Sequence, residues 1–287
     1  MKIVDEELKW LNEVIEAQAL ELQHEKKPDG WFSISSISKV PYIPFPNLSK
    51  EECVEIQEQA MEVLRTSIRQ NNYKEVAITY SLTDTSLDKY IVTNGELGYV
   101  HLMSDERVKD LLFNTREQKE LVVISLHNHP NDGFFSINDL ITFTENPSIR
   151  IMEIVNTKGE VAFLMRPKFE IYHCVAKTIL NAEPDYVEKK NIYQANNEGE
   201  LPKISDIIPN PKIRNEIVRT SVFMLEENGV YVSNYINIEN AQYLDFSHFK
   251  AEYEKHISAD IKDSKLNKPI RDFEYLENGE DGYEWEK

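Results

Sequence analysis

The stretch Val122 to Phe143, VVISLHNHPNDGFFSINDLITF, constrains the fold of this 287-residue chain more than any other segment. It begins as a continuous apolar run, which is typical of a strand buried on both faces. The run ends in His127 and His129. Because alternate side chains of a strand point to the same face, these two imidazoles project together and Asn128 points the other way. The segment therefore predicts a central strand with two imidazoles at its end.

The residues after this strand can bring a carboxylate back to the imidazoles. Pro130 ends the strand, and a short loop leads to a helix that begins at Ser136. Asp139 lies one turn inside that helix, within reach of the strand end. Two nitrogens and one oxygen are the protein ligands of a catalytic zinc site, in which water takes the fourth position. A second interpretation stays open, because Ser136 and Asp139 also form a plain capping box and paired histidines can simply be solvated.

The rest of the chain alternates between helical and strand patterns. We expect helices over residues 5–24, 50–71, 104–114, 136–146, 168–180 and 210–228. We expect strands within residues 28–40, 75–82, 89–93, 98–103, 120–129, 149–156 and 160–167. Ser49 with Glu52 forms a capping box for the second helix, and Ser104 is expected to cap the third. These patterns predict an α/β fold.

Changes in composition divide the chain into four parts. Residues 49–167 are expected to form one compact α/β domain, preceded by a helix and strand extension over residues 1–48. We expect residues 168–257 to form a mainly helical C-terminal region. Residues 258–287 form an acidic tail, and such polarity is typical of a mobile segment.

The charge and the absence of certain motifs exclude several classes of protein. A net charge of -18 argues against a nucleic-acid binder, because phosphate neutralisation needs a basic surface. We find neither an apolar stretch long enough to span a membrane nor a secretion signal at the N-terminus. The two cysteines, Cys53 and Cys174, indicate a reducing cytoplasm, although one disulfide stays possible. No glycine-rich phosphate loop is present.

A zinc hydrolase also needs a general base, and two glutamates are candidates. The chain has no His-Glu-x-x-His motif, so the base must come from another segment. Glu75, at the start of the strand EVAITYSL, is the first choice, and Glu96, in NGELGYV, is the second. For either residue alone, a surface carboxylate is the competing interpretation.

The sequence HNHPNDGFFSINDL resembles the His-x-His-Pro…Ser-x-x-Asp signature of the JAB/MPN (JAMM) metalloprotease superfamily, in particular its RadC-like and phage- or toxin-associated bacterial branches. The resemblance covers about residues 70–167. It implies a cytidine-deaminase-like mixed sheet flanked by helices, with helical N- and C-terminal extensions. The chain departs from the family in its shorter loop before Ser136 and in Asn131-Asp132, where RadC-like members usually carry Ser-Gly.

The resemblance also implies a site and an activity. His127, His129 and Asp139 correspond to the zinc ligands, Ser136 to a residue that stabilises the oxyanion, and Glu75 to the general base. The expected function is zinc-dependent hydrolysis of a peptide or isopeptide bond in a protein or peptide substrate, which could be ubiquitin-like or related to phages or toxins. The alternatives are a non-catalytic binding scaffold of the same fold and a RadC-like role in DNA processing, which the acidic charge disfavours.

Overall fold

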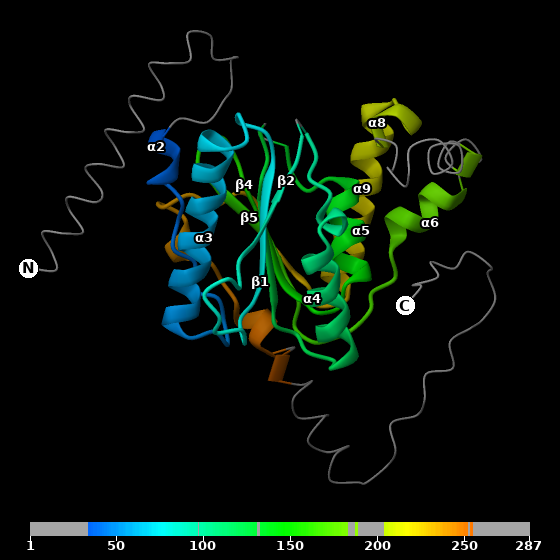
Figure 1. Cartoon of the computed structure of the whole chain (residues 1–287). Helices are drawn as coiled ribbons and strands as arrows, with labels where there is room; N and C mark the ends of the chain where they lie inside the picture. The colour runs from blue at the N-terminus through cyan, green and yellow to red at the C-terminus, as the bar shows by residue number, and fades with distance from the viewer. Residues whose placement is uncertain are drawn as a thin grey trace, which may run out of the picture.

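The structure is a computed structural model, and it describes residues 34–96, 98–130, 133–182, 187–188, 204–251 and 253–254 (Figure 1). The helices are α2 (Ile34–Ile37), α3 (Lys50–Arg69), α4 (Glu106–Glu117), α5 (Ile137–Glu145), α6 (Val175–Ala182), α8 (Ile204–Ile207) and α9 (Pro211–Glu227). The strands are β1 (Val76–Ser81), β2 (Ile91–Asn94), β3 (Val123–Asn128), β4 (Ile149–Val155), β5 (Val161–Met165) and β6 (Tyr231–Val232). Two short 3-10 helices are η1 (Leu102–Ser104) and η2 (Ala241–Tyr243).

The strands form one six-stranded mixed sheet in the order β2-β1-β3-β4-β5-β6. Strand β3 pairs with β4 in parallel, and the other neighbouring pairs are antiparallel. All six residues of β3 are buried, as the apolar run predicts for a central strand. The α/β class with a mixed sheet flanked by helices is therefore confirmed.

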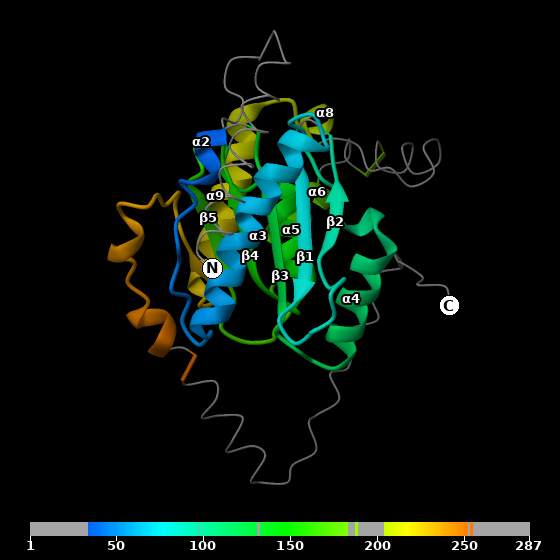
Figure 2. The same ribbon diagram turned by 60° about the vertical axis from the view of Figure 1, so that its left-hand side comes forward.

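Helices cover both faces of this sheet, so the fold has three layers (Figures 1 and 2). Helix α3 packs on one face, and α4, α5 and α9 lie on the other. The predicted capping box of α3 is confirmed, since the Ser49 side chain accepts from Glu52 N and the Glu52 side chain accepts from Ser49 N. Because successive side chains of a strand point to opposite faces, neighbouring side chains of β3 face different helical layers.

Residues beyond position 167 complete the sheet and one of its cores. Strand β6 pairs with β5, and the Tyr231 ring stacks on Phe163 with centroids 5.6 Å apart. Phe246 and Phe249 are buried in the core on the α3 side of the sheet. Residues on both sides of the predicted boundary at position 167 therefore share one hydrophobic core.

The strand predicted within residues 28–40 is wrong for the described part, where residues 34–37 form the short helix α2. Ser36 Oγ donates to the carbonyl of Thr157, 2.6 Å away in the turn between β4 and β5. That approach requires glycine at position 159, because a Cβ there would lie 2.0 Å from the Ser36 carbonyl oxygen. A contact with a distant turn therefore decides the conformation of this segment.

The strand predicted over residues 98–103 is also wrong. Gly98 adopts a φ of 85°, and the chain turns so that only an isolated bridge forms between Glu96 and Tyr99. The segment then enters η1, and the cap of α4 is Asp105 rather than the predicted Ser104. The Asp105 carboxylate accepts from Arg107 N at 2.9 Å, which satisfies a free amide of the first turn.

The helix predicted over residues 168–180 begins only at Val175. The preceding residues surround the buried guanidinium of Arg166, which donates to the Glu170 carbonyl and lies 4.6 Å from the centre of the Tyr172 ring. The Glu170 carbonyl is therefore engaged in a side-chain contact rather than in a helical one. Helix α9, by contrast, agrees with the predicted range of residues 210–228.

Several predictions fall on residues that the structure does not describe. These are the helix over residues 5–24, the acidic tail over residues 258–287 and, within the region predicted as mainly helical, residues 183–186 and 189–203. Within the described ranges, no helix combines the length and the hydrophobicity that a membrane span requires. Both cysteines are free thiols, so they form no disulfide with each other.

Candidate metal centre

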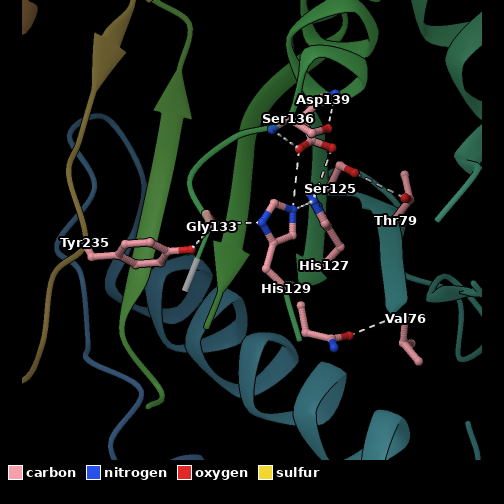
Figure 3. Close-up of polar contacts among 10 residues, drawn as sticks. Val76, Thr79, Ser125, His127, His129, Gly133, Ser136, Asp139 and Tyr235 are labelled. Atoms are coloured by element: carbon pink, nitrogen blue, oxygen red, sulfur yellow. Dashed lines mark hydrogen bonds and ion pairs between the residues drawn. The ribbon is translucent and has the colours of Figure 1, made fainter. Parts of the chain in front are cut away.

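Three side chains converge at the end of β3 (Figure 3). The Nε2 atoms of His127 and His129 lie 3.0 Å apart. His127 Nε2 is 3.3 Å from Asp139 Oδ1, and His129 Nε2 is 3.4 Å from Asp139 Oδ2. One ligand atom from each residue lies within 4.8 Å of the other two, so the group could hold one metal ion. The two histidines are buried, and Asp139 is the most exposed member with 15% of its side-chain surface accessible.

Asp139 serves both the cap of α5 and the cluster. Ser136 N donates to Asp139 Oδ2 at 2.7 Å, and Asp139 N donates to Ser136 Oγ at 3.2 Å, so the predicted capping box is present. The same carboxylate faces the two imidazoles through both of its oxygens. The cap fixes the orientation of the carboxylate. The two interpretations of the Ser-x-x-Asp sequence are therefore compatible.

The protonated nitrogen of His129 is set by a backbone carbonyl. His129 Nδ1 lies 2.8 Å from the carbonyl oxygen of Gly133, which can only accept a hydrogen bond. Nδ1 therefore carries the hydrogen. In the neutral ring, Nε2 then has a free lone pair directed at the cluster, which is the tautomer that a metal ligand needs.

His127 is also held in the neutral form that a metal ligand needs, in this case by burial. Burial lowers the pKa of His127, although Asp139 raises it, and the imidazole is therefore held neutral. Its Nδ1 atom is buried and has no hydrogen-bond partner among the described residues. A neutral imidazole is the form that binds a metal.

The charges of the cluster favour a cation. Burial alone would raise the pKa of Asp139, but His127 and His129 hold it well below its usual range. Burial alone would lower the pKa of His129, but its contacts with Asp139 and the charge of Glu75 raise it to about 9. The metal-free site thus keeps a proton beside an ionised carboxylate. A metal ion in the same place would supply that positive charge instead.

Glu75 lies next to this cluster. Ala77 of β1 is paired with His127 of β3 in an antiparallel register, so continuing the register by two residues places Glu75 opposite His129 and on the same face. Only 5% of Glu75 is exposed. Burial raises its pKa to about 8, the charge of His129 lowers it, and the charge of Asp139 raises it further. The first-choice glutamate is therefore electrostatically coupled to two members of the cluster.

Glu96, the second-choice base, has a different environment. Its carboxylate lies 2.6 Å from Lys74 Nζ, and 56% of its side chain is exposed. The backbone carbonyl of Glu96 accepts from Glu75 N at 3.2 Å, so Glu96 adjoins the start of β1 through its main chain. Its side chain forms a surface ion pair.

Sequence reasoning missed two polar residues that hold these elements in place. Asn128 Oδ1 accepts from Val76 N at 2.7 Å, which ties the end of β3 to the start of β1 beside Glu75. The guanidinium of Arg166 donates to the carbonyls of Phe143 and Asn146 at the C-terminal end of α5. A polar residue on an apolar strand could have pointed to Asn128, whereas the role of Arg166 depends on tertiary contacts.

The other histidines of the described chain are not members of this cluster. His101 precedes η1 and is exposed, and His248 is exposed as well. His173 is exposed, and its Nε2 atom lies 3.2 Å from Thr178 Oγ1. His256 is outside the described residues.

No family model, no curated protein and no solved structure matches this chain, so the site is interpreted from its own chemistry.

Proposed function

We propose that this protein is a zinc-dependent hydrolase of the JAB/JAMM type that cleaves a peptide or isopeptide bond. The observation that carries the proposal is the convergence of His127, His129 and Asp139, with their ligand atoms within 4.8 Å of one another. The proposed membership also draws on the order of these residues around Pro130 and Ser136. The mixed sheet between helical layers is compatible with that proposal.

The donor set fits a catalytic metal. Two neutral imidazoles and one carboxylate leave a coordination position open in a tetrahedral site. When bound there, zinc would polarise the scissile carbonyl and lower the pKa of a water molecule. Two histidines and one carboxylate also suit ferrous iron, so metal analysis should measure both elements.

Glu75 is the proposed general base. Its carboxyl has a pKa of about 8 in the metal-free protein, because it is buried and close to Asp139. A divalent cation in the cluster would add positive charge nearby and lower this pKa, which favours the ionised form. The carboxylate then accepts a proton from the attacking water and delivers it to the leaving amine. A pKa near neutrality suits both transfers.

Ser136 is the proposed donor to the oxyanion. Its Oγ accepts from Asp139 N at 3.2 Å, and this bond uses a lone pair of the hydroxyl oxygen. The hydroxyl hydrogen can therefore be donated to the charge that develops on the carbonyl oxygen. Ser136 is exposed at the start of α5, which leaves its hydroxyl accessible to a substrate.

The decisive experiment separates metal binding from turnover. We expect the purified full chain to hold about one zinc ion, as a three-ligand site requires, and His127→Ala to lose it. Glu75→Gln should keep the metal but lose hydrolysis of a panel of fluorogenic peptide and isopeptide substrates. Glu96→Gln is the matched control, because Glu96 forms a surface ion pair, and it should keep both properties.

Each other outcome has a defined meaning. A wild-type chain that binds no metal would contradict the proposal. Metal binding with no cleavage of any peptide or isopeptide probe would favour the non-catalytic scaffold. Metal-dependent cleavage of DNA would favour the alternative role in DNA processing. The substrate itself is proposed only as a class, a protein or peptide, with ubiquitin-like, phage and toxin-related proteins as the first to test.

A further inference from the structure

A tyrosine from the C-terminal part of the chain contacts the loop that orients His129. Tyr235 Oη donates to the carbonyl oxygen of Gly133 at 2.7 Å (Figure 3). The same oxygen accepts from His129 Nδ1 at 2.8 Å. A carbonyl oxygen has two lone pairs and can accept both hydrogen bonds at once. One backbone atom therefore connects the imidazole of a ligand to a residue 102 positions away from Gly133.

The position of Tyr235 is fixed by its neighbours in the chain. Ser233 N donates to the Phe163 carbonyl at 2.9 Å, and Phe163 N donates to Ser233 Oγ at 2.7 Å. Ile236 exchanges two backbone hydrogen bonds with Val161, of 2.9 Å and 2.7 Å. These contacts hold Tyr235 between two attachment points on β5, from which its phenol reaches the loop.

Aromatic rings provide a second contact between Tyr235 and this loop. The Phe134 ring meets the Tyr235 ring edge to face, with centroids 6.4 Å apart. Phe134 also packs edge to face against Phe135, with centroids 5.0 Å apart, and Phe135 is buried in the core. The segment after the ligand strand is thus held both through the Gly133 carbonyl and through its side chains.

The hydrogen bond from Tyr235 acts on the carbonyl of a glycine. Glycine has the widest choice of backbone conformations, and a rotation of its peptide would turn the carbonyl away from His129. The imidazole would then lose the bond that fixes its tautomer and ring orientation. The hydrogen bond from Tyr235 restricts that rotation, because it acts on the same oxygen.

We propose that Tyr235 is a positioning residue of the metal centre, which orients His129 through the Gly133 carbonyl. This inference rests on the proposed function in one respect, since it assumes that His129 is a metal ligand. It goes further because it makes the metal centre depend on the C-terminal region, which lies outside the segment that resembles the metalloprotease family. Mutation of the direct hydrogen-bond partner of a metal-bound histidine typically changes metal affinity by about 10- to 100-fold, and Tyr235 acts one hydrogen bond further out, so we expect an effect at the lower end.

The test is Tyr235→Phe in the full-length chain, which keeps the ring and removes only the hydroxyl. We expect its zinc affinity, measured by competition with a chromophoric chelator, to fall roughly tenfold. We also expect a changed visible absorption spectrum of the cobalt(II)-loaded protein, because the ring of His129 reorients. The melting temperature of the metal-free protein should change little. Tyr243→Phe is the matched control, because 78% of Tyr243 is exposed, and it should behave as the wild type.

Other results would overturn the inference in distinguishable ways. If Tyr235→Phe keeps wild-type zinc affinity, Tyr235 does not position the site. If its affinity falls but the cobalt spectrum is unchanged, its role is merely structural. If the wild-type chain binds neither metal, this inference and the proposed function fall together. If the wild type binds zinc without hydrolysing anything, only the hydrolase proposal fails, because these readouts measure binding.

Discussion

The two faces of the central sheet bury polar side chains in contrasting ways. On the face that carries α4, α5 and α9, His127, His129 and Asp139 meet as ionisable groups that shift one another's pKa. On the α3 face, Asn128 is engaged in neutral hydrogen bonds: it accepts from Val76 N at the start of β1 and donates to Ser67 Oγ of α3 and to the Lys74 carbonyl. His127 and Asn128 are neighbours on one strand, but His127 belongs to the charged cluster, whereas Asn128 forms a set of neutral hydrogen bonds, here called the neutral clamp. Among the described residues, the group of ligands that could hold a metal ion therefore lies on one face of the sheet.

Two buried glutamates show the same contrast in their neighbouring charges. Glu153 pairs with Leu126 and Phe163 on the α3 face, and burial alone raises its pKa to about 8. Burial raises the pKa of Glu75 to about the same value on the opposite face, but the charges of His129 and Asp139 also act on it. A cation in the cluster should therefore ionise Glu75 and leave Glu153 protonated. Burial thus gives the two carboxyls similar pKa values, but only Glu75 has charged neighbours that also act on its pKa.

The largest expected effect comes from removing charge on the cluster face. Asp139→Asn keeps an oxygen that can accept from Ser136 N, so the cap of α5 should persist. Zinc affinity should fall by more than the roughly 10- to 100-fold typical of an outer hydrogen-bond partner, because a ligand itself is weakened. Metal analysis and chelator competition measure this. If this variant bound one zinc ion with wild-type affinity, Asp139 would not be a ligand, and the proposed difference between the two faces would be contradicted.

The second prediction concerns the pH dependence of zinc binding. Because His129 has a pKa of about 9 in the metal-free protein, it holds a proton below that pH which zinc must displace. Apparent affinity should therefore rise roughly tenfold per pH unit between about pH 6 and pH 8. Calorimetry in buffers with different ionisation enthalpies should detect at least about one proton released per zinc. A flat affinity across this range would contradict the assigned protonation of His129.

A third prediction tests the neutral clamp on the α3 face. Asn128→Ala leaves the buried Val76 N–H without its 2.7 Å acceptor, which should lower the free energy of unfolding by about 1–3 kcal/mol. Urea unfolding of the metal-free protein measures this loss. Asn94→Ala, at an exposed position of β2, should change it by less than about 0.5 kcal/mol. Zinc stoichiometry should be kept, and its complete loss would show that the faces are not independent.

A fourth prediction concerns Glu153. Its folded-state pKa of about 8 lies above the usual value of 4.5, so the unfolded chain releases the proton first and stability falls as the pH rises between these values. Glu153→Gln should abolish that loss and raise the melting temperature at pH 9 by at least about 2 °C, the shift that roughly 1 kcal/mol produces in a domain of this size.

Its control is the exposed carboxylate of Glu106, which forms a surface pair with Lys109. Glu106→Gln should leave the melting temperature nearly unchanged, because exposed ion pairs contribute little. Near pH 4.5 the Glu153→Gln effect should also largely disappear. A constant effect of Glu153→Gln at all pH values would indicate altered packing rather than the removal of a buried charge.

The local features of the candidate site could be predicted from the sequence because they follow from strand and helix geometry. Alternation along β3 places His127 and His129 on one face, and the Ser136 capping box orients Asp139. The same reasoning identified the capped helix α3. Some errors occurred where distant contacts override the local pattern. Ser36 of α2 binds the turn between β4 and β5, where a strand was predicted for its own segment, and Arg166 binds the Glu170 carbonyl, where a helix was predicted.

The sequence by itself thus determined the α/β class, the central strand and the set of potential metal ligands, because these depend on periodicities of two and 3.6 residues. Only the tertiary structure decided that Glu75 is buried with His129 and Asp139 as charged neighbours, that Asn128 clamps the start of β1, and that Tyr235 reaches the Gly133 carbonyl. The physical reason is that strand register and the docking of the C-terminal region join residues far apart in the chain, which no local pattern specifies.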